Sequence, residues 1–301
     1  MIIDIQHIID EPLKSLLGNE PYFLTKIVCT KPVFLVMTPK IDFPQFVLKV
    51  GDCDSLNPLH ERMVQLHQKL GDFVSEPIKL IPLNSTTSVW IQRGLQGIPW
   101  FRISQHVPFE QIQEIAVESL LFLHGIVGQD PLYRSNHTPG LSLHQILDKL
   151  QNYGTLADPS IEVAIRSSAR KLESLGTVES FFQHGDFCIN NLIFNNTRAC
   201  VIDFDDFGLN SAPLHDFFSL WQSLSLFSPH PLSNQSYEEL LKRYCNQIQI
   251  PQNCIEYATE LRLHQICFEL LQCVHNAREP YLRVLTKLLQ KVIAEQQHRI
   301  A

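Results

Sequence analysis

The chain has 301 residues, of which 45% are hydrophobic and 18% charged, and its formal net charge is -7. This composition is typical of a folded globular protein and excludes a disordered chain. The acidic balance argues against a general nucleic-acid-binding protein, which needs a basic face. No apolar run reaches the roughly 18 residues of a membrane-spanning helix, and the first residues lack a secretory-signal pattern.

The eight cysteines are scattered along the chain, and no two form a Cys-x-x-Cys pair. In a chain of this length, such spacing favours reduced and mostly buried thiols over a disulfide framework. We therefore expect a cytoplasmic protein without a membrane or nucleic-acid partner.

Strand patterns dominate the first hundred residues. The two first strands predict a hairpin with its turn at Lys31 and Pro32, and the third strand is expected to stop at Gly51. Helical spacing of apolar residues separates the third and fourth strands. The predicted elements are strands at 22–30, 32–39, 45–50, 78–83 and 87–93 and a helix at 57–70.

The segment 94–100, GLQGIPW, breaks this pattern with two glycines and a proline. Such residues punctuate regular structure, so we predict a lobe boundary here. The expected fold class is α+β, with a β-rich N-terminal lobe at 1–93 and a mainly helical C-terminal lobe at 94–301.

Helical spacing dominates from Pro108 onward. Helices are predicted at 108–126 and 159–176, and two to four more between Tyr237 and Gln297, interrupted at Pro251 and Pro280. Two short strand-like runs, NLIF and ACVID, stand out in this helical half, and we expect them to form a hairpin that brings Asp203 beside Asn191.

The segment 183–194, QHGDFCINNLIF, places ion-binding side chains in an otherwise apolar stretch. Kinases have a catalytic loop in which an Asp precedes a metal-binding Asn, followed by a metal-binding Asp. Asp186, Asn191 and Asp203 fill these positions. Because Mg²⁺ prefers hard oxygen ligands, Asn191 and Asp203 are candidate metal ligands, and Asp186 is the candidate that orients the attacking hydroxyl. Asn190 lacks the catalytic spacing.

Lys49 lies in a predicted strand, and Glu61 follows twelve residues later, early in the next helix. In kinases a strand lysine paired with a helix glutamate holds the α- and β-phosphates. We therefore predict a Lys49–Glu61 ion pair. Alternatively, Lys49 is a surface lysine of the strand, and Asp186, Asn191 and Asp203 are the turn residues of a plain hairpin.

The motifs HGDFCINN, VIDFDDFG and LHDF resemble those of the aminoglycoside phosphotransferase/choline kinase superfamily of small-molecule kinases. The resemblance implies a bilobal, protein-kinase-like fold that binds ATP or GTP with Mg²⁺, as a monomer or homodimer. It implies that Asp186 is the catalytic acid and that His184 and Asp216 support the catalytic loop. The segment IQRGLQG would bind the nucleotide base, through Gln92 and Gly94.

Two positions depart from the family pattern. Cys188 stands where the family often has a histidine, and the turn near CTKPV, expected to cover the nucleotide, has no glycine. Phosphate contact at this turn would then come from side chains such as Lys31.

The predicted activity is transfer of the γ-phosphoryl group to a hydroxyl of a small molecule. Candidate acids for an amine on this acceptor are Asp205, Glu260 and Glu269. Glu256 and Glu260, four residues apart, are expected to share one helical face. An aminoglycoside, amino sugar, amino alcohol or hydroxy amino acid would suit these acids, although Arg262 or Arg278 could pair with them instead, and Asp205 is equally a structural acid.

Three alternatives fit the same motifs. One is an inactive, kinase-like nucleotide-binding module, and another is a kinase-like fold that transfers a different group. The third is a protein kinase, against which the short distance from Asp203 to Asp216 argues, since it leaves little room for an activation segment.

Overall fold

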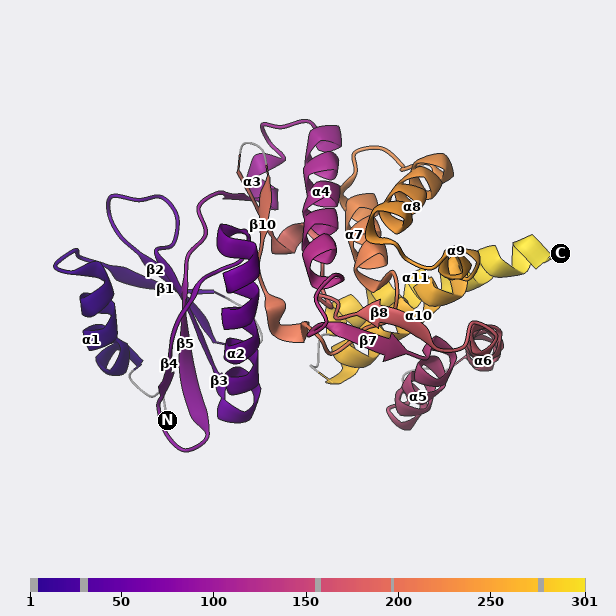
Figure 1. The fold of residues 1–301 in the computed structure, drawn as a ribbon, viewed down its shortest axis with the longest axis horizontal. Helices are drawn as coiled ribbons and strands as arrows, with labels where there is room; N and C mark the ends of the chain where they lie inside the picture. The colour runs from indigo at the N-terminus through magenta and orange to yellow at the C-terminus, as the bar shows by residue number, and fades with distance from the viewer. Residues whose placement is uncertain (1–4, 28–31, 155–157, 196–197, 276–278, 301) are drawn as a thin grey trace. The chain divides into compact units, whose positions relative to one another are not determined.

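The computed structural model describes residues 5–27, 32–154, 158–195, 198–275 and 279–300 (Figure 1). The chain groups into two compact units. Unit 1 comprises Met1–His106 and Leu192–Asp205, and unit 2 comprises Val107–Asn191 and Asp206–Ala301. The predicted α+β class is confirmed, with an antiparallel sheet in the N-terminal region and a mainly helical remainder. The lobe boundary predicted after Arg93 stays a prediction.

Five antiparallel strands form the main sheet of unit 1, in the order β1-β2-β3-β5-β4. The predicted hairpin of β1 and β2 is present, and its turn at Lys31 lies outside the described residues. The third strand continues past its predicted stop at Gly51, because it pairs with β5 as far as Asp52. The strands are β1 (Phe23–Ile27), β2 (Val33–Met37), β3 (Phe46–Asp52), β4 (Pro77–Pro82) and β5 (Thr87–Arg93).

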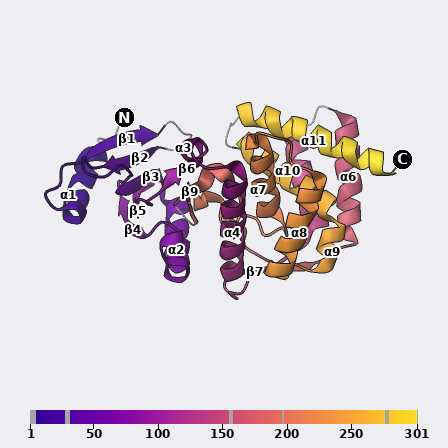
Figure 2. The ribbon, with the colours of Figure 1, turned by 90° about the horizontal axis from the view of Figure 1, so that it is seen from above.

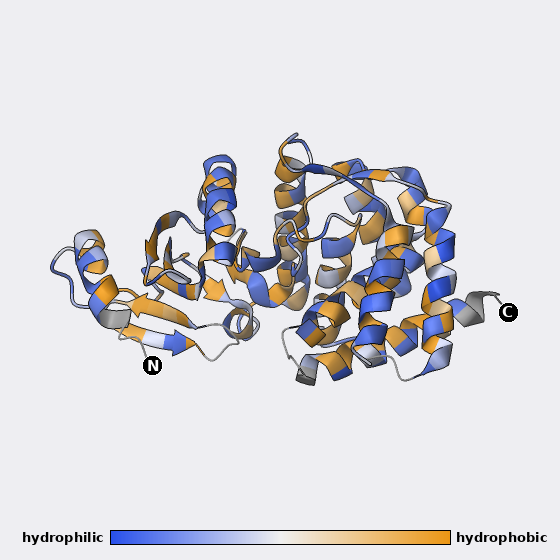
Figure 3. Cartoon of the chain, turned by 90° about the horizontal axis from the view of Figure 1, so that it is seen from below, coloured by the Kyte–Doolittle hydropathy of each residue, from blue (hydrophilic) through white to orange (hydrophobic). Residues whose placement is uncertain are grey.

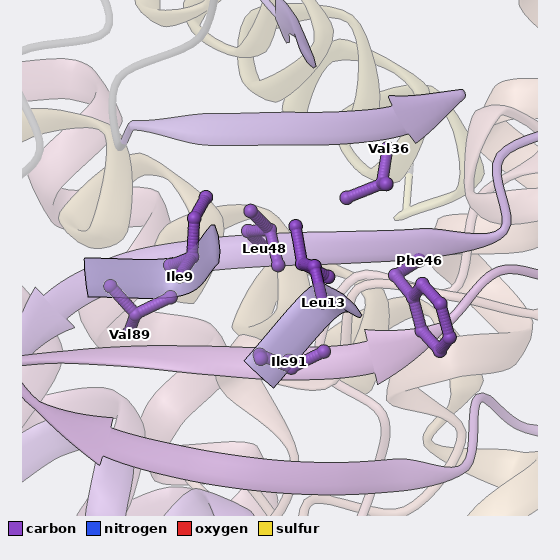
Figure 4. Close-up of a cluster of buried hydrophobic side chains, with 7 residues drawn as sticks. All are labelled: Ile9, Leu13, Val36, Phe46, Leu48, Val89 and Ile91. Atoms are coloured by element: carbon purple, nitrogen blue, oxygen red, sulfur yellow. The ribbon is translucent and has the colours of Figure 1, made fainter. Parts of the chain in front are cut away.

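Two helices cover the faces of this sheet (Figure 1). Helix α1 (Ile5–Leu17), which the strand patterns did not predict, buries Ile9 and Leu13 against it. Helix α2 (Cys53–Leu70) begins four residues before its predicted start, because the Asp52 carboxylate caps it by accepting from the Ser55 N–H at 2.8 Å. Figure 4 shows the cluster under α1, which contains Ile9, Leu13, Val36, Phe46, Leu48, Val89 and Ile91.

A second, three-stranded sheet completes unit 1. Strand β9 (Leu192–Phe194) lies between β10 (Ala199–Val201) and β6 (Ile98–Pro99), and the predicted β9–β10 hairpin is confirmed. A side chain at Gly97 would put a Cβ 2.5 Å from the Phe194 carbonyl oxygen, so only glycine permits this approach. The short helices α3 (Trp100–Ile103) and η1 (Gly71–Phe73) flank this sheet.

Unit 2 is built from amphipathic helices and one two-stranded sheet of β7 and β8. Its helices carry hydrophobic and hydrophilic stretches in alternation (Figure 3), and α11 packs along α10 and α6 (Figure 2). The helix α5 was not predicted. The elements are α4 (Phe109–Val127), β7 (Arg134–His137), α5 (Pro139–Asn152), α6 (Pro159–Glu173), β8 (Val178–Phe181), η2 (Ile189–Asn191), α7 (His215–Phe227), α8 (Asn234–Ile248), α9 (Gln252–Glu256), α10 (Ala258–His275) and α11 (Glu279–Ile300). None of the helices in the described ranges combines the length and apolar character needed to cross a bilayer.

Candidate active site

The candidate residues divide between the two units. Lys49, Asp203 and Asp205 belong to unit 1, whereas Asp186 and Asn191 belong to unit 2. Each group has its own internal geometry.

In unit 1, two acids hold the Lys49 ammonium. Nζ of Lys49 lies 2.7 Å from Asp203 Oδ1 and 2.6 Å from Asp205 Oδ1. Burial alone would lower the pKa of Lys49, but the charges of these two acids raise it above its usual range. The lysine is therefore firmly protonated. Asp203 follows strand β10 in a left-handed conformation, with φ of 64°, and its side chain is 48% exposed.

The structure does not bring Glu61 to Lys49. The Glu61 side chain is exposed, whereas its neighbour His60 lies edge-on to Trp90, with ring centroids 6.0 Å apart. Trp90 is the strand neighbour of Lys49. The helix therefore turns His60, and not Glu61, toward β5, the neighbour of the strand that carries the lysine, and Lys49 pairs with Asp203 and Asp205 instead of the predicted Glu61.

Gln92 and Gly94 lie at the end of β5. Gln92 is buried between its strand partners Val47 and Pro77. The Gly94 N–H donates to the Gln45 carbonyl at 2.8 Å, and a Cβ at this position would overlap the backbone of Pro44. The backbone donor of Gly94 is thus already engaged within the sheet, and nucleotide contact by these two residues stays a prediction.

In unit 2, Asp216 at the start of α7 organises the catalytic loop. Its carboxylate accepts from the backbone N–H groups of His184 at 2.6 Å and Gly185 at 2.9 Å, and it bonds to His124 Nε2 at 2.9 Å. Burial alone would raise the pKa of Asp216, but the bond with His124 and the nearby histidines lower it to about 2. A buried, ionised acid therefore fixes the loop, at the position predicted for this support.

The side chain of His184 is also buried and serves the loop directly, because its Nδ1 accepts from the Asp186 N–H at 3.3 Å. Asp186 is in turn bonded by Asn191. The Asn191 amide nitrogen donates to the Asp186 backbone carbonyl at 2.9 Å and to its carboxylate at 3.0 Å. Among the described residues, no hydrogen bond engages the Asn191 amide oxygen. Asn190 makes no such contact and is exposed.

A cavity of about 700 Å³ within unit 2 opens onto Asp186. Cys188 and Asn190 of the loop line it together with Glu269 and Tyr281 from helices α10 and α11. Burial and the Asp186 charge raise the pKa of Cys188 well above its usual value, so this thiol is not activated as a nucleophile. Sequence reasoning missed Tyr281 as a residue of this cavity, because it lies far from the loop in sequence and belongs to no motif.

Glu269 is the unusual group in this cavity. Its Oε1 accepts from Ser219 at 2.8 Å and from Gln265 at 2.5 Å, whereas its buried Oε2 has no hydrogen-bond partner in the described part of the chain. Burial and, to a smaller extent, the charge of Asp186 raise the pKa of Glu269 to about 8. The hydrogen bonds from Ser219 and Gln265 lower this pKa but do not offset the rise. With a pKa of about 8, Glu269 is mostly protonated at neutral pH and ionises just above it, so it can exchange a proton, or bind a cation in its ionised form.

Glu260 does not line the cavity, although Glu256 and Arg262 do. The prediction that Glu256 and Glu260 share a helical face is wrong, because α9 ends at Glu256 and α10 begins at Ala258. Glu260 instead pairs with Lys171 at 3.2 Å. No ion pair joins Arg262 to Glu269 within the described ranges, and Arg278 lies outside them.

Comparisons with known proteins agree with this fold. The sequence model of the phosphotransferase enzyme family matches residues 32–257. The structure is similar to the GDP complex of a point mutant of aminoglycoside 2'-phosphotransferase-IIIa (TM-score 0.70, 12% identity, covering 98% of this chain and 99% of that one). It is also similar to the choline kinase LicA from Streptococcus pneumoniae (TM-score 0.64, 17% identity, covering 97% of this chain and 99% of that one). No curated protein matches the sequence.

The kinase-like fold and the match to the family model together define a phosphotransferase. The chain belongs to the phosphotransferase enzyme family. The resemblance stated from its motifs is confirmed, and the enzyme is a small-molecule phosphotransferase that acts on a hydroxyl group.

Proposed function

We propose that this enzyme transfers the γ-phosphoryl group of ATP, or of GTP, to a hydroxyl of an amine-bearing small molecule. The observation that carries the proposal is the shared cavity of unit 2. Asp186, the candidate for the attacking hydroxyl, and Glu269, the unpaired acid, line the same space of about 700 Å³. Similar folds have been seen with GDP and with ADP.

In this proposal Asp186 receives or orients the proton of the acceptor hydroxyl. The carboxylate is well suited to orientation, because the Asn191 amide fixes one of its oxygens. Phosphoryl transfer needs little covalent chemistry from the protein, so positioning and charge stabilisation supply most of the rate. The Lys49 ammonium, firmly protonated, would bind the nucleotide phosphates in place of its present acid partners.

The side chains predicted as metal ligands have the chemistry that a divalent cation requires. Magnesium takes hard oxygen ligands and usually retains water and phosphate oxygens, so it needs few ligands from the protein. The amide oxygen of Asn191 and the half-exposed carboxylate of Asp203 are of this kind. The described residues contain no group of three His, Cys, Asp or Glu side chains that would hold a metal alone. Bound magnesium would neutralise charge on the phosphates.

An ammonium group on the acceptor would find its partner in Glu269. A carboxyl whose Oε2 is buried without a hydrogen bond gains most from a cationic donor. Glu256, on the wall of the same cavity, would add to the attraction. Aminoglycosides, amino sugars, amino alcohols and hydroxy amino acids all offer an amine near a hydroxyl.

Matched acceptors test the proposal. Purified enzyme with ATP or GTP and Mg²⁺ is offered each amine and its N-acetyl derivative, with nucleoside diphosphate release and product mass as readouts. We expect phosphorylated product from at least one amine and a large loss on acetylation. Equal turnover of the acetylated acceptor would reject the amine while leaving the kinase activity intact.

A further inference from the structure

Three buried groups of unit 2 form a hydrogen-bonded chain that ends on Gly185, the residue before Asp186. His215 Nε2 lies 3.2 Å from the Gly185 carbonyl oxygen, and His215 Nδ1 lies 2.8 Å from Asn210 Nδ2. Asn210 Oδ1 accepts from the Ala212 N–H at 2.8 Å. His215 is fully buried, and Asn210 is 4% exposed. Neither belongs to the predicted site.

The direction of every bond in this chain follows from its ends. The Ala212 N–H can only donate, so the Asn210 oxygen faces it and the Asn210 NH₂ group faces His215. His215 Nδ1 must then accept. The Gly185 carbonyl can only accept, so His215 Nε2 carries the proton. The imidazole is therefore neutral and in a single tautomer. Burial lowers the pKa of His215 and so also favours the neutral form.

The Gly185 peptide needs such a restraint. Gly185 adopts a φ of 90°, and a Cβ there would lie 2.8 Å from Asp206 Cβ, so glycine with its wide backbone freedom is required. Asp216 already holds the N–H groups of His184 and Gly185. His215, the neighbour of Asp216 in sequence, holds the carbonyl that leads into Asp186.

We propose that His215 is a positioning residue for phosphoryl transfer: its Nε2–H fixes the Gly185 carbonyl and with it the direction in which Asp186 enters the acceptor cavity. The inference rests on the proposed role of Asp186. Misplacing a reacting group by about 1 Å can cost about 100-fold in rate. Losing the restraint should therefore lower kcat and leave both substrates bound.

The test compares two buried histidines. His215→Phe keeps an aromatic ring against Phe268 but removes the donor, and His264→Phe removes another fully buried histidine, bonded to Ser142 and absent from the cavity wall. At a temperature where both variants are folded, we expect kcat to fall about 10- to 100-fold for His215→Phe with KM nearly unchanged, and to stay near wild type for His264→Phe. His215→Gln, whose amide can donate to Gly185, should recover part of the loss. Full kcat in His215→Phe, or equal losses in both phenylalanine variants, would overturn the inference.

A second measurement needs no variant. ¹⁵N NMR of the wild-type imidazole should show His215 protonated at Nε2 and not at Nδ1 at neutral pH, and a proton on Nδ1 would refute the chain. Asp186→Asn separates the two hypotheses. Full turnover in that variant would remove the proposed role of Asp186, whereas an inactive Asp186→Asn beside a fully active His215→Phe would remove only the positioning.

Discussion

Nζ of Lys49 lies 2.6 Å from Oδ1 of Asp205, and only 13% of the lysine side chain is exposed. Removing one member of a buried ion pair leaves the other charge without compensation. This pair therefore contributes to the integrity of unit 1, and in the proposed function the phosphates of the nucleotide would replace its acids. Asp205 and Asp203 take the place that kinases give to a helix glutamate.

A double-mutant cycle tests this relationship. We expect Lys49→Met and Asp205→Asn to show a coupling of about 1–3 kcal/mol in the free energy of unfolding without nucleotide or metal. The cycle of Lys49→Met with Glu61→Gln should show coupling near zero, because Glu61 is exposed. Strong coupling to Glu61 in denaturant titrations would contradict the structure.

The candidate catalytic acid gives the largest expected effect. Asp186→Asn should lower kcat by about 10²–10⁴, because an amide cannot accept a proton from the attacking hydroxyl. The unfolding transition and nucleotide binding should change little, since the main-chain bonds of the loop remain. Steady-state kinetics with a calorimetric binding control measure both, and near-normal turnover would exclude Asp186 from this role.

The paired asparagines offer a matched comparison. Asn191→Ala removes the amide that bonds to Asp186 and the candidate metal oxygen, so turnover should fall at least about 10-fold and require more Mg²⁺. Asn190→Ala changes an exposed side chain and should cost less than about 0.5 kcal/mol in stability and little in turnover. Magnesium titrations of both variants check the assignment, which fails if Asn190 matters as much as Asn191.

Glu269 is expected to lower the free energy of unfolding at high pH and to bind the amine of the acceptor. Its pKa of about 8 lies above the ordinary 4.5, so between these pH values the folded chain keeps a proton that the unfolded chain has lost. Stability from this group therefore falls as the pH rises through that window. Glu269→Gln should stabilise the protein by about 1–2 kcal/mol at pH 8 and raise the KM of an amine acceptor. Denaturant titrations at pH 5 and 8 check the first claim, and a destabilised variant at pH 8 would refute it.

The partly buried His137 should make the protein acid-sensitive. Burial, with a smaller contribution from His215, lowers the pKa of His137 from 6.5 to about 4. Between pH 6.5 and 4, His137 is protonated in the unfolded chain but neutral in the folded chain. The free energy of unfolding therefore decreases by up to about 1.4 kcal/mol for each unit by which the pH is lowered. His137→Gln should flatten this decline between pH 6.5 and 4, measured by denaturant unfolding. The exposed His230 supplies the control, and an equal change in His230→Gln would contradict the assignment.

Local patterns predicted most of unit 1. The hairpin that carries Asp203 followed from spacing, because strand alternation is a property of neighbouring residues. The position of Asp216, in unit 2, came from the resemblance to the kinase superfamily. Helix α1 was missed, since Gln6 and His7 in its first turn and the internal Pro12 hide its apolar face. The partner of Lys49 depends on which acid the tertiary fold brings nearest, and sequence spacing favoured Glu61 over Asp205.

The errors in unit 2 have similar causes. Glu256 and Glu260 have helical spacing, but the helix breaks between them. His215 lies 30 residues from the carbonyl that it bonds, so no local pattern indicates the contact. Such long-range polar bonds are set by packing, and single-sequence reasoning has no access to them.

The place of β9 and β10 in unit 1 has a consequence for synthesis on the ribosome. Residues up to His106 emerge first, but the sheet of β6 lacks its partners until Val201 has been translated. At a synthesis rate of about 5–20 residues per second, the edge of β6 stays unpaired for several seconds or more. Unit 1 therefore completes its fold only after all of helices α4 to α6 have been translated, and a fragment ending at His106 should expose an unpaired strand and associate with other chains.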